Sequence, residues 1–531
     1  MPPPPGFPGV NIEEQPSGVR VITGVPTSIT AFVGRARRGP VDSDVESQVS
    51  IDSFANFERR FGGLWRDSAL SFSVRDFFLN GGSQALIVRL YHPVAGAKAK
   101  ARLSAGTLQL EAAYPGAWAN RLRARIDHHT SPLPDGSANR EIFNLAVRDG
   151  ETGQVEFFAN LSVKRGDLHR VDKVLENNSK LVRAGMLPRA RPQKHADPAN
   201  GQDVWDDNAV GTYDKVFAAN EASDGGPLQE SDFTGAGKES AHKGLYALDK
   251  AGLFNLLCIP GYKETGSGFD VDKGVVSSAA AYCEARRAML LVDPPASWRT
   301  ASDARAGISL GVGTKSENAA LFFPRLRQPN PERNNQKEDF GPGGAVAGVF
   351  ARTDAQRGVW KAPAGMGASL IGVFELAVPL TDLEAGELNP LAVNCLRSFP
   401  ATGKVVWGAR TLDGADQIAS EWKYIPVRRT ALFIEESLYR GTQWVVFEPN
   451  DEPLWAQIRL NVGAFMHGLF RKAAFQGITP RDAYFVKCDR ETTTQNDINL
   501  GVVNIIVGFA PVKPAEFVVI KIQQIAGQIE T

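Results

Sequence analysis

Residues 253–326 decide the fold of this chain. They contain LFNLLCIPG (253–261), VVSSAAAYCEARRA (275–288), MLLVDPP (289–295), TASDARAGISLG (300–311) and NAALFFPRL (318–326). The first, third and last segments are short apolar runs followed by Gly or Pro, as is typical of buried strands, and the two between them are compatible with helices. Alternation of strand and helix at this spacing predicts a parallel sheet in an α/β domain.

The segments on either side extend this sheet domain. Upstream, apolar periodicity and turn signals predict one or two strands in 19–33, helices in 50–63 and 69–79, and a buried strand in 85–91. Downstream, we expect a helix in 345–360 and a strand in 370–378, and residues 404–412 begin the transition to the last domain. Between the two parts, residues 93–245 carry short alternating segments that predict an inserted antiparallel module, in which 188–243 are expected to be long exposed loops.

The last hundred residues predict a further, smaller α/β domain. Residues 422–447 have a strand-like start and then a long helical pattern. The next helix, 451–472, carries the strongest signals: Asn450 as a cap, acidic residues in its first turn, and Leu454, Ile458, Phe465 and Leu469 on one face. We expect a core strand in 501–509 and a last strand, EFVVIKIQQI (516–525), that has no partner in sequence.

Composition indicates a multidomain globular protein of mixed α+β class. At 531 residues the chain is expected to form roughly two to four domains. Lys+Arg and Asp+Glu are 59 each, so there is no global attraction to nucleic acid or an anionic membrane, and little charge opposes self-association. Apolar runs are too short for a membrane helix, and the N-terminus lacks the pattern of a secretory signal. We expect these parts: 1–20 an extended arm, 21–92 and 246–420 the core, 93–245 the insert, 421–512 a C-terminal domain and 513–531 a strand arm.

Several short motifs suggest chemistry, but each has a simpler interpretation. In GISLGVGTKS (307–316) the order of Gly, Lys and Ser is wrong for a phosphate loop, and its flanks are helix then strand. GPGGAVAG (341–348) could open a helix over an anion, although close packing explains its glycines better. Asp293 follows a strand end, where α/β proteins often bind ligands, but two prolines there indicate a strand break.

The remaining candidates are histidines, cysteines and small basic clusters. His128 and His129 are adjacent and have no third ligand at metal spacing, and the four cysteines are far apart without a CxxC pair. Arg35, Arg37 and Arg38 are expected to form a solvated loop. We find no convergent set of titratable groups and therefore expect no catalytic site, no cofactor and no metal.

Taken together, the segments resemble the contractile tail sheath family of phage tails and contractile injection systems. The similarity rests on long ordered segments, from PGVNIEE (8–14), TAFVGRARRGP (30–40) and FFLNGGSQALIVRL (77–90) to YPGAWANRLRARI (114–126), GVFARTDAQRGVWKAPAG (348–365), LNPLAVNCLRSFPATGKVVWGARTL (388–412) and the C-terminal segments above. It is weak across 188–243. The resemblance implies subunits stacked in helical layers around an inner tube, in an extended state of high energy that contracts when a baseplate triggers it.

The resemblance also implies partners and contact residues. Terminal arms of one subunit would complete sheets in its neighbours, which assigns strand donation to Val10, Asn11, Ile12, Glu13, Glu14, Phe517, Val518, Val519, Ile520, Lys521 and Ile522. The C-terminal domain would lie innermost, with Arg459, Arg471 and Lys472 as tube contacts, and the insert outermost. Implied partners are further copies, the inner tube, baseplate and cap proteins, after assembly in the bacterial cytoplasm. The alternative is an α/β nucleotide- or small-molecule-binding enzyme using the 245–380 sheet.

Overall fold

The computed structural model describes residues 21–519 except 45, 138, 200 and 266–267. The chain divides into two compact units. Of the described residues, the first unit, the sheet unit, comprises 28–355 and 363–423, and the second, the C-terminal unit, comprises 21–27, 356–362 and 424–519. Among the described residues, no helix is both long enough and apolar enough to cross a bilayer.

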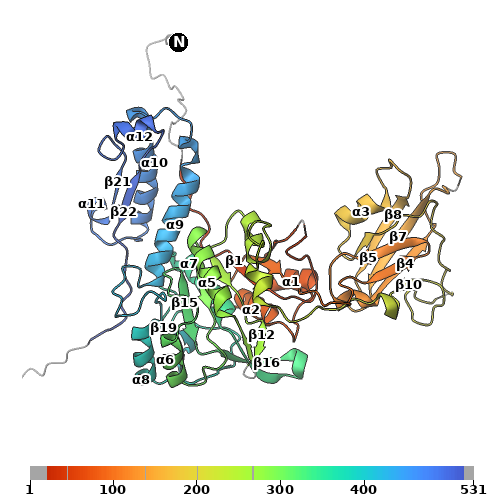
Figure 1. Cartoon of the computed structure of the whole chain (residues 1–531), viewed down its shortest axis with the longest axis horizontal. Coiled ribbons are helices and arrows are strands. Elements are labelled where there is room, and N and C mark those ends of the chain that lie inside the picture. The colour runs from red at the N-terminus through yellow and green to blue at the C-terminus, as the bar shows by residue number, and fades with distance from the viewer. Residues whose placement is uncertain (1–20, 45, 138, 200, 266–267, 520–531) are drawn as a thin grey trace, which may run out of the picture. The chain divides into compact units, whose positions relative to one another are not determined.

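The sheet unit is built on an eight-stranded mixed sheet with the order β2-β3-β1-β11-β14-β15-β19-β20 (Figure 1). Its strands are β1 (Thr30–Gly34), β2 (Val49–Ile51), β3 (Ala85–Arg89), β11 (Leu256–Cys258), β14 (Met289–Val292), β15 (Ala319–Phe323), β19 (Val393–Phe399) and β20 (Gly403–Val406). The six central strands are parallel, whereas β2 and β20 close the two edges in antiparallel pairs. The parallel sheet predicted from 253–326 is thus confirmed. Strands of a parallel sheet that is covered on both faces are apolar along their whole length, which is the pattern of these segments.

Helices cover this sheet, and their ends follow local capping rules. They are α1 (Phe54–Phe61), α2 (Ala69–Leu79), α4 (Glu230–Thr234), α5 (Lys273–Ala285), α6 (Ala301–Ser309), α7 (Gly343–Arg357) and α8 (Asp382–Leu388). Ser53 caps α1 by accepting a hydrogen bond from the Asn56 amide, and Gly62 ends that helix at φ 91°. Thr300 and Asp303 form a capping box that starts α6. These signals were local, and the helices predicted from them are confirmed.

Two strand predictions in the sheet unit were too long. Of residues 19–33, only β1 is a strand, and before it the described residues from 21 to 29 form no regular element. Of residues 370–378, only β18 (Glu375–Leu376) pairs, and it joins a small sheet with β16 (Leu326–Asn330) and β17 (Gln336–Phe340) rather than the main one. Both stretches have β-branched residues, but pairing, not propensity, makes a strand. The segment before 371 touches the edge strand β20 only briefly, through the bridge between Ser369 and Val405 and the bond from the Leu370 amide to the Lys404 carbonyl at 2.8 Å.

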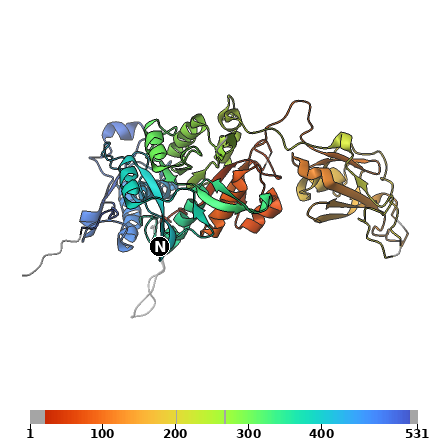
Figure 2. The same ribbon diagram turned by 90° about the horizontal axis from the view of Figure 1, so that it is seen from below.

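The antiparallel strands expected within 93–245 lie between residues 102 and 215 (Figures 1 and 2, orange to yellow), whereas Leu228 and Leu245 near the end of that range pack in the core of the main sheet. One sheet contains β10 (Asp214–Lys215), β6 (Leu122–Asp127), β7 (Ile142–Asp149) and β8 (Val155–Ser162), and the other β4 (Arg102–Ala105), β5 (Leu108–Ala112) and β9 (Val182–Ala184), with helix α3 (Val171–Asn178). The prediction of exposed loops for 188–243 was partly wrong. The segment is mostly irregular, but Trp205 and Val216 are buried because their loops fold back onto apolar surface, and Phe233 of α4 is buried in the core of the main sheet.

The C-terminal unit pairs two long helices with a two-stranded sheet. Its elements are α9 (Ile425–Gly441), α10 (Glu452–Arg471), α11 (Pro480–Ala483), α12 (Gln495–Asn499), β21 (Tyr484–Lys487) and β22 (Ile506–Phe509). Leu454, Ile458 and Leu469 of α10 are buried in its core, as predicted, whereas Phe465 is partly buried against that core.

Three details of this unit differ from the sequence prediction. Residues 422–424 form no strand, because α9 starts at Ile425 with Pro426 in its first turn. Asp451, not Asn450, caps α10: its side chain accepts the Leu454 amide, while Asn450 accepts from Trp455 Nε1 and donates to the Val502 carbonyl. The core strand expected in 501–509 is only β22, which lies in a two-stranded sheet and is half-exposed.

Candidate functional site

The end of the described chain is an extended apolar segment that leaves its own unit. After β22, Ala510 donates its amide to the Ala483 carbonyl at 2.8 Å, and Glu516 accepts from the Tyr424 hydroxyl at 3.4 Å. Beyond this anchor Phe517, Val518 and Val519 are 76%, 83% and 78% exposed, and no described strand pairs with them. The other predicted donor residues, Val10, Asn11, Ile12, Glu13, Glu14, Ile520, Lys521 and Ile522, lie outside the described residues.

The small sheet of the C-terminal unit has open edges. Within the described residues β21 and β22 pair only with each other, from Tyr484 opposite Phe509 to Lys487 opposite Ile506. One face packs on the unit's core, while Phe485 and Ile506 are half-exposed. A two-stranded sheet is marginal alone, and unpaired edge groups accept additional strands. These edges are therefore able to receive a strand such as 517–519.

Helix α10 presents a solvent-facing stripe opposite its core face. Gln457, Leu460, Ala464, His467 and Arg471 follow one another at helical spacing, and all are exposed. The three residues predicted to contact the tube differ in their surroundings. Arg471 and Lys472 are exposed at the helix end, whereas the Arg459 guanidinium is bound to Glu452 Oε1 at 2.6 Å and to the Cys488 carbonyl. Arg459 is therefore occupied inside its own unit.

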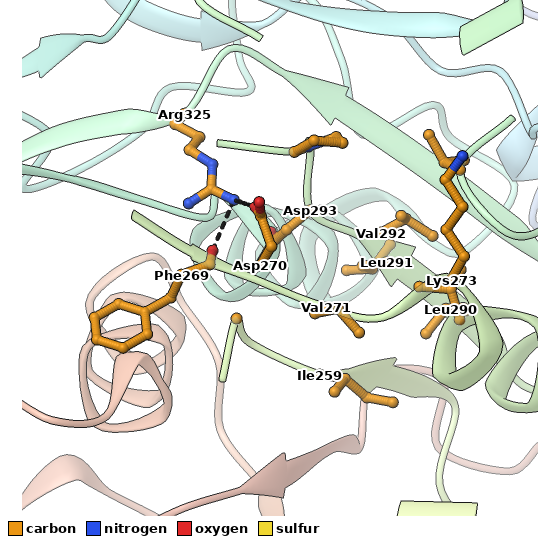
Figure 3. A pocket seen from close by; sticks show the side chains of 14 residues that line it. Ile259, Phe269, Asp270, Val271, Lys273, Leu290, Leu291, Val292, Asp293 and Arg325 are labelled. Carbon is orange, nitrogen blue, oxygen red and sulfur yellow. Dashed lines mark hydrogen bonds and ion pairs between the residues drawn. The ribbon is translucent and has the colours of Figure 1, made fainter. Parts of the chain in front are cut away.

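A cavity of about 200 Å³ lies at the carboxyl ends of β11 and β14, between these strands, β13 (Gly268–Asp270) and α5 (Figure 3). Its walls are mainly apolar, including Ile259, Val271 and Leu290. Asp270, Asp293, Arg325 and Lys273 also line it. This is where the alternative interpretation, an α/β enzyme, would place its chemistry.

Asp293 in this cavity serves the fold. Its Oδ1 accepts the Gly343 amide at 2.8 Å at the start of α7, so the helix N-terminus holds a carboxylate of the same chain. A Cβ on Gly341 would lie 2.0 Å from Asp293 Oδ2. Burial raises the pKa of Asp293 to about 6, and the nearby Arg325 opposes that shift. The glycine-rich stretch 341–348 also packs tightly elsewhere, because a Cβ on Gly344 would lie 2.1 Å from the Ser73 carbonyl oxygen.

Arg325 and Asp270 complete an internally satisfied cluster. Arg325 Nε donates to the Pro294 carbonyl at 2.9 Å, and its Nη2 donates to Asp270 Oδ1 at 2.7 Å (Figure 3). Asp270 Oδ1 also accepts the Ala296 amide at 2.7 Å. The sequence flagged only Asp293 in this cluster, since its members come from three separate elements. Their mutual bonds indicate a structural role.

The other candidate motifs also have structural explanations. Thr314 and Lys315 lie in the loop from α6 to β15, so helix precedes strand and the phosphate-loop geometry is absent from this described segment. His128 contacts the Pro192 carbonyl at 2.9 Å. Among the described residues no three His, Cys, Asp or Glu side chains are placed to hold a metal, and all four cysteines are buried and free.

The Arg35, Arg37 and Arg38 cluster is not the solvated loop that the sequence suggested. Each arginine binds the inserted module: Arg35 donates to the Asp224 carbonyl at 2.9 Å, Arg37 pairs with Glu151, and Arg38 pairs with Asp149 at 3.0 Å. Only the fold brings these partners, more than 110 residues away, next to the basic loop. The cluster therefore anchors the insert to the sheet.

Arg89, at the end of β3, is the centre of this anchor. Its fully buried guanidinium donates to the carbonyls of Ala36 at 2.8 Å, Gly39 at 2.7 Å and, in the insert, Pro115 at 2.9 Å. Burial lowers the pKa of Arg89 to about 10. A buried cation held by backbone oxygens from both parts ties the insert to the strand end.

Two family profiles match consecutive parts of the chain. The phage tail sheath protein central domain matches residues 234–412, and the phage tail sheath C-terminal domain matches residues 418–525. The chain belongs to the phage tail sheath family. The match to the central domain covers the strands of the main sheet from β11 to β20. The match to the C-terminal domain covers the described helices and strands from α9 to β22.

Individual sheath proteins are similar over different lengths. The tail sheath protein of Burkholderia phage BcepMu is 23% identical over 88% of this chain and 87% of its own. The tail sheath protein of Vibrio phage KVP40 is 28% identical over 32% of this chain, and the match covers only 25% of that protein's length. The match to the tail sheath protein of Enterobacteria phage T4 covers 30% of that protein's length. Among solved structures, the contracted PVC sheath complex of an extracellular contractile injection system has a TM-score of 0.57 at 21% identity, covering 98% of both chains.

Replacing Arg89 should uncouple the insert. In Arg89→Met, carbonyls of Ala36, Gly39 and Pro115 lose their charged donor, so we expect a loss of about 3 kcal/mol or more in the free energy of unfolding. Limited proteolysis should then cut first in the exposed segment 93–98 that leads into the insert. Arg66→Met, at a side chain 63% exposed, is the control and should change little. Unchanged stability and cleavage in Arg89→Met would contradict the anchoring role.

The buried Asp293 should make stability depend on pH. Its native pKa of about 6 lies above the ordinary value of 3.8, so the native state holds the proton more tightly than the unfolded state. This contribution is full below pH 3.8 and is lost as pH rises through 6. Relative to Asp293→Asn, the wild type should lose up to about 3 kcal/mol between pH 4 and pH 7. Urea unfolding of both proteins across this range measures the difference, which should not stay constant or increase.

Proposed function

We propose that the chain is the structural subunit of a contractile sheath that surrounds an inner tube and drives it through a target envelope. The observation that carries the proposal is the consecutive match of both sheath domains, 234–412 and 418–525, ending in an exposed strand segment. The near-complete coverage by a contracted injection-system sheath supports the same conclusion at the level of the fold. The alternative, an enzyme on the 245–380 sheet, is not favoured, since the charged groups at its strand ends satisfy one another.

Neighbouring subunits are joined by donated strands. Residues 517–522 of one copy, together with 10–14, would add to open edges such as those of β21 and β22 in another copy, which is strand addition. Each backbone hydrogen bond so formed contributes about 1 kcal/mol net. A few bonds per contact, repeated along a polymer, keep copies connected while rigid units rearrange. The energy for contraction would then be stored in subunit contacts, without ATP hydrolysis in this chain.

The inner tube would face the α10 stripe. Leu460, His467 and Arg471 lie on its exposed side, and Lys472 follows at the helix end. We retain Arg471 and Lys472 as charge contacts with an acidic tube surface, whereas the internal bonds of Arg459 make it a poor candidate. Baseplate and cap proteins would hold the two ends of the polymer, which would assemble in the bacterial cytoplasm as part of a phage tail or tail-like particle.

Breaking the terminal strand should abolish polymers but spare the fold. Phe517→Asp with Val519→Asp places charges on a strand that must enter a neighbour's sheet, and both positions are exposed in the single chain. We expect hollow striated cylinders for the wild type by negative-stain electron microscopy and folded monomers for the variant, by circular dichroism and sedimentation. Lys513→Asp, before the Glu516 anchor, is the control and should polymerise. Cylinders formed by the double variant would overturn strand donation.

Charge reversal at the end of α10 should affect the tube but not the polymer. Arg471→Glu with Lys472→Glu should reduce co-sedimentation of the sheath with its inner tube at least tenfold, while cylinders without tube still form. The matched control reverses two other exposed cations of the same unit, Arg481→Glu with Arg490→Glu. Equal loss in both double variants, or no loss in the first, would remove Arg471 and Lys472 from the tube contact.

A further inference from the structure

The turn between α9 and α10 holds a bulky aromatic residue in an unfavourable position. Phe447 is fully exposed and has φ 71°, in the left-handed region that glycine or asparagine adopts more easily. Such a conformation costs about 1–3 kcal/mol. Its neighbour Val446 is 59% exposed. We call Val446 and Phe447 the knob.

Hydrogen bonds hold the base of the knob in place, while the Phe447 side chain is fully exposed. Asn450 bridges its base, because it donates to the Val502 carbonyl at 2.9 Å and accepts from Trp455 Nε1 at 2.9 Å. The Glu448 amide donates to the Val445 carbonyl at 3.2 Å. Two exposed acidic residues follow it in the turn: Glu448, and Asp451, whose Oδ1 also accepts the Leu454 amide as the cap of α10. An apolar tip with an acidic rim is suited to an apolar hollow with a basic rim.

The sheet unit offers a hollow of that kind. A groove of about 630 Å³ lies between α6 and the segment 412–418. Its apolar lining includes Ile308, Val312 and Ile418, and its cations are Arg305 and Lys315. Leu310, 80% exposed, follows the end of α6 beside it. Arg305 contacts Glu387 only at 3.5 Å between exposed side chains, a weak pair that can exchange partners.

We propose that the knob of one copy docks in this groove of a second copy. The charges are complementary, since Glu448 and Asp451 would meet Arg305 and Lys315, and the groove has room for the two apolar side chains. The occupant is another copy because the proposed sheath, on which this inference rests, surrounds each subunit with others. Knob and groove are different surfaces, so the contact is heterologous and propagates along a polymer.

Substitution of Phe447 separates this contact from a purely internal role. Phe447→Gly relieves the left-handed backbone, so the isolated subunit should melt at a higher temperature, while the critical concentration for polymerisation should rise roughly 10- to 100-fold through loss of an aromatic anchor. Ala473→Gly is the control: Ala473 also has a left-handed φ, 59°, but no large side chain. It should stabilise without affecting polymerisation. Equal polymerisation of Phe447→Gly and wild type would overturn the proposal.

Cysteine cross-linking tests the docking partner. Val446→Cys and Ser309→Cys each add one exposed thiol to a chain whose four native cysteines are buried. A mixture of the two single variants, polymerised and oxidised, should yield a cross-linked dimer, which requires two copies, and neither variant alone should yield as much. Polymers of the mixture that give no cross-linked dimer would overturn docking between copies. So would a double variant, with both substitutions in one chain, that forms the disulfide only within that chain. Failure of the wild type to form polymers would instead contradict the proposed function.

Discussion

Backbone N–H and C=O groups in a strand must find partners, and the two units of this chain meet that requirement differently. In the sheet unit, antiparallel β2 and β20 close the edges of six parallel strands, and helices cover the faces. In the C-terminal unit, β21 and β22 pair only with each other among the described residues, and the chain continues into an exposed apolar segment. A sheet whose backbone groups are paired can act as a rigid body, whereas a sheet with unpaired edge groups can bind a strand from another chain.

Buried charge in the sheet unit is used to hold elements together. Asp293 terminates the backbone dipole of α7, Arg325 joins β13 to the end of β14, and Arg89 gathers carbonyls from the basic loop and the insert. Removing one partner from such a group leaves an uncompensated buried charge, which costs more than the intact arrangement contributes. The charged groups at the strand ends are therefore bound to one another. An α/β enzyme would keep reactive groups free at this place.

Exposed surfaces carry the features expected of a polymer subunit. Residues 517–519, the α10 stripe and the knob are exposed apolar or charged groups. With equal numbers of basic and acidic residues, long-range repulsion between copies is small, so short-range contacts decide association. Contacts between unlike surfaces extend into open helices or rings, and rigid units joined by strands can change packing without separating.

The sequence by itself determined the elements whose cause is local: the apolar strands of 253–326, the capped helices α1, α6 and α10, and the alternation that makes the insert antiparallel. It also carried the family resemblance, which depends on residue order alone. Tertiary structure decided whatever requires a distant partner. Of residues 370–378 only β18 is a strand, because the chain leaves the edge strand β20 after Leu370 and pairs instead with β16. Asp451 rather than Asn450 caps α10, because the Asn450 side chain is bound to Trp455 and Val502. Arg38 and Arg89 became buried anchors because folding placed Asp149 and Pro115 beside them, and a charge acquires its role only from the groups that surround it.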